Sequence, residues 1–223
     1  MSESETGFRM AIVAFAAVSG LLAFWILATQ LSVTGVYKLP TTVDASTAAK
    51  IHRRDAALAG ALGVVRGDLL AQSAFTYSDL FWASSDDAAS ADTARRHIEE
   101  ALTYAPHRSD VWLILAAVGS RLGWRKPDPA SALKMAFYTG PSEISLIPMR
   151  LLVAARSTSL NDSDVQQFVR RDIRLILLRI PELRRAIQIA YRAANSTNKQ
   201  IIEKAVNEID PAFVEPLRAP LSG

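Results

Sequence analysis

Residues 94–116, ARRHIEEALTYAPHRSDVWLILA, decide the fold of this chain. The first half carries small and apolar residues at spacings of four and three, which is the pattern of one helix face: Ala94, Ile98 and Ala101. Pro106 cannot continue a helix, so the chain must turn there. The stretch therefore predicts two packed helices, over residues 93–104 and 109–122. We expect its large side chains and the next tryptophan to lie in the core: Tyr104, Trp112, Leu115 and Trp124.

The same order of helix, stop and helix recurs on both sides. Residues 59–70 align with residues 101–112, and residues 133–141 align with residues 98–106, through matching small residues, a proline or an Arg-x-Asp pair. This recurrence resembles the junction between tetratricopeptide-type repeats, where one helix pair hands over to the next. The resemblance covers about residues 55–145 and implies a stack of helical hairpins that binds other proteins.

Three positions depart from the pattern of that family. Gly119 stands where the family has an aromatic residue, Pro129 where it has a small helical residue, and Arg150 where it has an apolar one. The motif does not continue after residue 145. The alternative is a helical bundle without repeats, and because both readings consist of helices, the sequence predicts an all-α fold.

Outside the central stretch, helical spacing with capping and stop residues predicts further helices. They cover about residues 51–63, 67–82, 130–139, 143–157, 163–179, 181–194 and 197–209. Residues 84–92 are acidic but lack the spacing and the glycine of a calcium loop, so they predict a polar turn. The predicted domains are a short tail over 1–9, a transmembrane helix over 10–31, a linker over 32–47, a tetratricopeptide-like all-α domain over 48–215 and a loose tail over 216–223.

The apolar segment over residues 10–31 contains no charged side chain. Its length is sufficient to cross about 30 Å of hydrocarbon, and it lacks the polar face of a soluble helix. A cleaved signal peptide is the alternative, but its apolar part is usually shorter and ends at a small-residue cleavage site that this chain lacks. We therefore expect a single-pass anchor in the lipid bilayer.

The orientation of this anchor follows from two arguments that disagree. Lysine and arginine residues are almost balanced on its two sides, and Arg53 and Arg54 slightly favour a cytoplasmic domain. The arrangement of a short head, one apolar helix and a large soluble part resembles bacterial single-pass proteins with a periplasmic repeat domain. That resemblance implies the bacterial inner membrane and a soluble domain in the periplasm.

Arginines concentrate near the C-terminal end of the chain. Seven of them lie between Val165 and Asn195, against Asp172 and Glu182. Five form the candidate partner-binding surface: Arg170, Arg171, Arg174, Arg184 and Arg185. Such a surface suits an acidic protein face, an anionic lipid or an acidic polymer, whereas a solvated helix face is the alternative. Nucleic acid is not expected, because no aromatic or glycine pattern of a nucleic-acid module accompanies the charge.

The sequence contains no motif for catalysis or for a cofactor. Cysteine is absent, and the three histidines, His52, His97 and His107, do not have the spacing of metal ligands. Phosphate-binding and dinucleotide-binding glycine patterns are also missing. We expect no metal, no cofactor and no enzyme activity, with an all-α enzyme as a remote alternative.

These features together predict a membrane-anchored helical-repeat adaptor that binds a protein partner at the cell envelope. Envelope polysaccharide, secretion and complex assembly are settings that the resemblance implies. The alternative is an accessory subunit of an integral membrane complex, which contacts that complex through the transmembrane helix.

Overall fold

The structure is a computed structural model that describes residues 3–32, 61, 66–83 and 88–220. This part of the chain is all-α, as predicted, and contains no strand. The predicted linker and nearly all of the helix predicted over about 51–63 lie outside the described residues.

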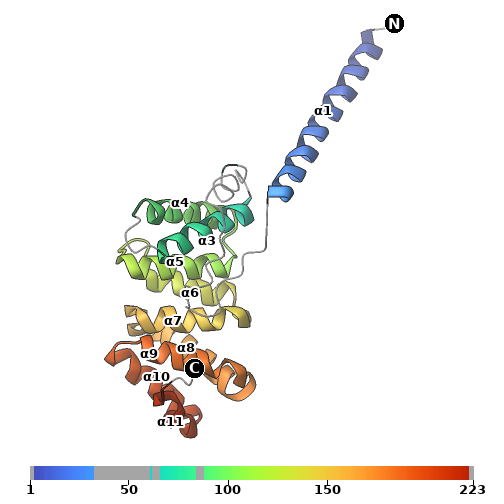
Figure 1. Cartoon of the computed structure of the whole chain (residues 1–223). Coiled ribbons are helices and arrows are strands. Elements are labelled where there is room, and N and C mark those ends of the chain that lie inside the picture. The colour runs from blue at the N-terminus through green and yellow to red at the C-terminus, as the bar shows by residue number, and fades with distance from the viewer. Residues whose placement is uncertain (1–2, 33–60, 62–65, 84–87, 221–223) are drawn as a thin grey trace.

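Helix α1 (Glu3–Ser32) contains the predicted transmembrane segment. Its window Gly7–Ala28 is 22 residues long with a mean hydropathy of 2.4, so this helix is long and apolar enough to span a membrane. None of that window is buried by the rest of the chain, and α1 stands apart from the other helices (Figure 1). Residues 3–9, expected as a tail, are the first turns of the same helix.

The other helices agree closely with the predicted ranges. The bounds are α3 (Gly67–Ala83), α4 (Ala88–Tyr104), α5 (Ser109–Leu122), α6 (Pro129–Thr139), α7 (Ile147–Arg156), α8 (Ser163–Arg179), α9 (Arg184–Ala193), α10 (Ser196–Ile209) and α11 (Val214–Arg218). Short 3-10 turns lie at Ile144–Leu146, Thr158–Asn161, Pro181–Leu183 and Pro211–Phe213. Several boundaries differ: α4 begins inside the predicted polar turn, and α7 and α9 begin only after short 3-10 turns. Residues 216–218 of the predicted loose tail belong to α11, whose Leu217 is fully buried.

The helices form an elongated stack with α3 and α4 at one end, α5 to α7 in the middle and α8 to α11 at the other end (Figure 1). Helices α3 and α4 pack as one pair, and α5 and α6 as the next. The odd-numbered helices α3, α5, α7 and α9 contact each other in series, and α6, α8 and α10 form a second series. Each helix buries its apolar stripe against the layers next to it, so the core runs through the length of the stack.

A proline follows four of the described helices, namely α4, α6, α8 and α10. The four dipeptides are Ala105-Pro106, Gly140-Pro141, Ile180-Pro181 and Asp210-Pro211, and each directly follows a helix or its last residue. Proline lacks the N–H that the next helical hydrogen bond needs, and it restricts the residue before it to extended backbone. The chain therefore turns at each of these points and enters the next helix.

The central stretch packs largely as the sequence predicts. Ala94, Ile98 and Ala101 are fully buried, and Leu115 is buried as well. Trp112 and Trp124 are partly buried against the core, and the indole Nε1 of Trp112 donates to the Pro106 carbonyl at 2.8 Å. Tyr104 is 50% exposed, so its expected place in the core is wrong. It lies in the last turn of α4, where the helix reaches the edge of the stack.

Two glycine positions mark close helix contacts. A Cβ atom on Gly67 would lie 2.6 Å from the Ala105 Cβ, and one on Gly140 would lie 2.5 Å from the Ser109 Cβ. In both cases the start of one helix meets the end of its partner within the same pair. These equivalent contacts extend the recurrence seen in the sequence to the packing.

The departures from the repeat pattern also have a packing explanation. Gly119 leaves room for Trp124 and Pro129, whose side chains come within 3.1 Å and 3.3 Å of the place where a Cβ would be. Trp124 follows the left-handed turn at Gly123 and packs back against Gly119 of α5.

Candidate partner-binding surface

Helix α8 has a buried apolar face and an exposed polar face, and the exposed face carries three of the five candidate arginines. The side chain of Asp162 caps its first turn by accepting from the backbone N–H groups of Asp164 and Val165, at 3.0 and 3.3 Å. The buried face is mainly apolar: Val165, Val169, Ile173, Ile176 and Leu177. The opposite face therefore presents Arg170, Arg171 and Arg174, all of which are exposed.

Two of the candidate arginines hold the stack together. Arg170 forms an ion pair with Glu208 of α10 at 2.5 Å. Arg184 donates to the carbonyl of Leu177 at 3.2 Å, lies 3.8 Å from the Asp210 carboxylate and stacks over Phe213 at 5.4 Å. The charges of these two arginines are largely matched within the chain.

Arg171 is partly engaged and remains accessible. It contacts the Pro141 carbonyl at 3.4 Å and lies over the ring of Phe168 at 5.7 Å. The nearest carboxylate oxygen belongs to Asp172, at 3.7 Å. The Arg171 side chain is still 46% exposed. These contacts restrain the guanidinium without covering it.

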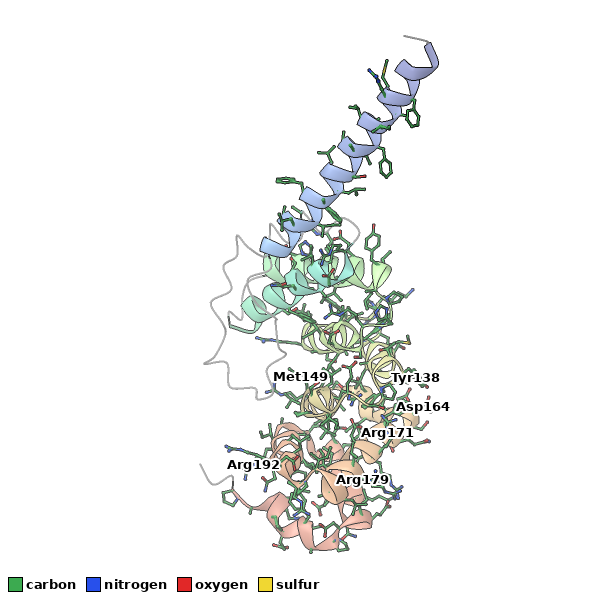
Figure 2. All side chains as sticks on the ribbon, turned by 90° about the vertical axis from the view of Figure 1, so that its right-hand side faces the viewer. Tyr138, Met149, Asp164, Arg171, Arg179 and Arg192 are labelled. Atoms are coloured by element: carbon green, nitrogen blue, oxygen red, sulfur yellow. The ribbon has the colours of Figure 1, made fainter. Side chains whose placement is uncertain are left out.

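Arg174 and Arg185 are exposed and make no hydrogen bond or ion pair with any described residue. The five candidates do not all share one face, because Arg184 and Arg185 belong to α9. The other arginines of this region also spread around the stack: Arg192 lies at the opposite edge from Arg171 and Asp164 (Figure 2). The structure thus brings together Arg171 and Arg174 as the accessible pair, one turn apart on α8.

A row of three apolar side chains and one arginine runs along the outer side of α8. Phe168, Arg171, Leu175 and Leu178 recur at spacings of three and four, and we call these four residues the α8 stripe. Leu178 is 64% exposed, whereas Phe168 and Leu175 are partly buried against the core. Tyr138 of α6 extends the stripe, since its ring meets that of Phe168 edge to face at 5.2 Å.

A buried charge pair behind the α8 stripe was not identified as a pair from the sequence. Arg150 of α7 is completely buried, and its Nε lies 3.3 Å from Oδ2 of Asp172, which is also buried. Its terminal nitrogens donate to the carbonyls of Gly140 at 2.9 Å and Glu143 at 3.1 Å. The only sequence signal was the arginine at an apolar position of the repeat pattern.

The charge of Arg150 is stabilised by more contacts than the charge of Asp172. The Arg150 guanidinium has two carbonyl acceptors and stacks 4.8 Å from the ring centre of Phe137. Neither the Arg150 Nε nor the Asp172 Oδ2 has a hydrogen-bond partner. Burial raises the pKa of Asp172 to about 6, although Arg150 and Arg171 act in the opposite direction. Burial also lowers the pKa of Arg150, which the charge of Asp172 partly offsets.

The histidines do not form a site among the described residues. His97 Nδ1 contacts the hydroxyl of Ser73 between α4 and α3, and burial lowers the pKa of His97. His107 is exposed, and His52 lies outside the described residues. No group of three or more metal-ligating side chains occurs in the part of the chain that the structure describes.

Comparisons with protein-family models, curated proteins and solved structures find no match to this chain.

Proposed function

We propose that this chain is a membrane-anchored helical-repeat adaptor that binds protein partners at the bacterial cell envelope and has no catalytic activity of its own. The observation that carries the proposal is the α8 stripe and its margin, where the exposed side chains of Leu178 and Tyr138 lie near the exposed Arg171 and Arg174. Exposed apolar patches with a polar rim commonly mark protein-binding sites. Leu178 and Tyr138 lie outside the core of the described stack, so these two side chains are not needed to complete it.

The tetratricopeptide-like character of the stack is part of the same proposal. It is supported by the paired helices α3/α4 and α5/α6, by the equivalent glycine contacts and by the prolines that follow α4, α6, α8 and α10. Stacked helical pairs present extended surfaces and suit binding better than chemistry. The layers after α6 pack more through α7 with α9 than through α7 with α8, so the regular pairing is confined to the first part.

We further propose that α1 anchors the chain in the inner membrane with the stack in the periplasm. Anchoring raises the effective concentration of the stack near membrane partners. Alkaline phosphatase and green fluorescent protein fused in turn after Thr47 test the orientation. We expect an active phosphatase and a dark fluorescent protein, and the reverse result would place the stack in the cytoplasm.

The adaptor function is tested by isolating the full chain from membranes after chemical cross-linking. We expect defined protein partners with the wild-type chain and much weaker recovery after charge reversal at Arg171 and Arg174, the two arginines that do not hold the stack together. Reversal of Arg125 and Arg156, which are exposed and lie outside the candidate surface, is the matched control because it changes the same amount of charge elsewhere. Absence of any protein partner with the wild-type chain would refute the adaptor function.

The second candidate function is an accessory subunit that contacts a membrane complex through α1. Most of its apolar side chains over residues 10–27 are exposed, and a Cβ on Gly20 would meet nothing within 4 Å. A small residue on such a surface allows close approach of another helix. Replacement of residues 10–31 by an unrelated apolar helix separates the two functions: the adaptor keeps its partners, whereas the accessory subunit loses them.

A further inference from the structure

The charged residues near α8 are mostly matched in pairs. Lys134 lies 2.9 Å from Asp162 and 3.7 Å from Asp164, and Arg170 lies 2.5 Å from Glu208. The buried Asp172 lies 3.3 Å from Arg150 and 3.7 Å from Arg171, so one negative charge is shared between two arginines and cannot neutralise both. Arg171 and Arg174 therefore remain as a local positive surplus on the exposed side of α8.

Arg171 is restrained in a way that favours recognition of a carboxylate. The Pro141 carbonyl and the ring of Phe168 limit its motion, which reduces the entropy that binding would otherwise remove. Its exposed guanidinium keeps donors that can bind a carboxylate in two-point geometry. Arg174, one turn along on the same side, adds a second positive charge without a partner of its own.

The apolar part of the surface has the length of a short helix. From Phe168 to Leu178 the α8 stripe spans about 15 Å at the usual rise of 1.5 Å per residue. Tyr138, which is 59% exposed, widens it at the α6 side. Figure 2 places Tyr138 and Arg171 at the same edge of the stack. A row of apolar side chains beside arginines complements a helix with one apolar face and acidic flanks.

We propose that the α8 stripe, together with Tyr138 and Arg174, docks an acidic amphipathic helix of a protein partner. This inference deepens the proposed adaptor function and rests on it. The partner's apolar face covers Phe168, Tyr138 and Leu178, and its acidic residues meet Arg171 and Arg174.

An anionic bilayer fits the same surface less well. Asp164 stands on the same side of α8, 52% exposed, and would be repelled by anionic headgroups. Only Tyr138 and Leu178 offer well-exposed large apolar side chains here, which is little for insertion into a bilayer. A protein helix can place an uncharged or basic residue opposite Asp164 and acidic residues opposite the arginines. A protein partner therefore matches both the negative and the positive charges of this surface.

The test is site-specific photo-cross-linking in the full membrane-anchored chain. A benzophenone amino acid replaces Leu178 in one variant and Arg185 in a control variant, and the captured segment is identified by peptide mass spectrometry. We expect capture from position 178 of a segment with an apolar helical face and acidic flanks. The combined change Arg171→Glu and Arg174→Glu should reduce that capture about tenfold, since it replaces attraction by like-charge repulsion.

Several outcomes would overturn the inference. These are capture of lipid, capture of a segment without acidic flanks, no capture from position 178, or capture that is unaffected by the two charge reversals. Thermal unfolding followed by circular dichroism verifies that the variants remain folded, and Leu178→Ser provides a second variant that keeps all charges. If general cross-linking still recovers protein partners while position 178 captures none, the adaptor function stands and the α8 docking site does not.

Discussion

Replacement of Asp172 by asparagine tests whether the buried charge pair stabilises the stack. The change keeps the side-chain shape and removes the negative charge that lies 3.3 Å from the Arg150 Nε. In an ordinary buried ion pair, loss of one partner costs about 3 to 5 kcal/mol, because the other charge is left uncompensated. In the asparagine variant Arg150 still donates to the Gly140 and Glu143 carbonyls and still lies over the Phe137 ring. These contacts continue to stabilise its buried positive charge.

The Asp172 carboxylate itself is poorly supported. One of its oxygens has no hydrogen-bond partner, and burial raises its pKa to about 6, above the value of about 3.9 for an unfolded chain. A raised pKa means that the ionised form is less stable in the folded protein than in water. We therefore expect Asp172→Asn to leave the free energy of unfolding at pH 7 unchanged, or to increase it by up to roughly 3 kcal/mol.

The pH dependence of the free energy of unfolding is a second, independent test of whether the ionised Asp172 destabilises the fold. Between about pH 4 and pH 6 the folded protein binds more protons at Asp172 than the unfolded chain does, so the carboxyl adds stability as the pH falls through its folded pKa. From pH 7 to pH 5, wild type should gain roughly 1 kcal/mol relative to the asparagine variant. Other titrating groups are common to both proteins and cancel in the difference.

The assay is urea unfolding of the full chain in mild detergent, followed by far-ultraviolet circular dichroism at pH 7, 6 and 5. Two results would refute the reasoning. A loss of 3 kcal/mol or more in the variant at pH 7 would show an ordinary stabilising ion pair. Equal pH profiles for the two proteins would show that the pKa of Asp172 is not raised.

Three further substitutions test other contacts by the same unfolding assay. Arg150→Met should cost about 3 kcal/mol at pH 7, because it leaves two carbonyls without their donor and the Asp172 carboxylate without its opposite charge, and adding Asp172→Leu should recover only the part that is due to Asp172. Gly140→Ala should cost about 1 to 3 kcal/mol, since its Cβ would lie 2.5 Å from the Ser109 Cβ, and Ser109→Gly should relieve the clash. Asn198→Ala should cost about 2 kcal/mol, because the buried amide donates to two carbonyls at the end of α7, both at 2.9 Å. A variant whose free energy of unfolding equals that of wild type would contradict the contact on which its prediction rests.

Most of the described helices could be predicted because their signals are local. Helical spacing and the capping Asp162 define α8, and proline ends several helices, so the ranges of α5, α6 and α8 agree with prediction within a residue. The end of the chain was harder to predict. Leu217 is buried only because α11 returns against α9 and α10, and no short stretch of sequence contains that contact.

The candidate surface was only partly predictable. The cluster of arginines is visible in the sequence, but their roles depend on acids that are distant along the chain. Glu208 is brought to Arg170 by the packing of α10 on α8, and Asp210 to Arg184 by the end of α10. Sequence spacing alone could not separate these arginines from Arg174.

The sequence by itself determined the apolar N-terminal helix, the all-α class and the points at which the stack turns. These properties depend on length, periodicity and proline, which act within a few residues. Only the tertiary structure decided which charges are matched and which remain exposed, and it buried Arg150 against Asp172. An ion pair depends on distance in space, and helices remote in sequence set that distance when they pack.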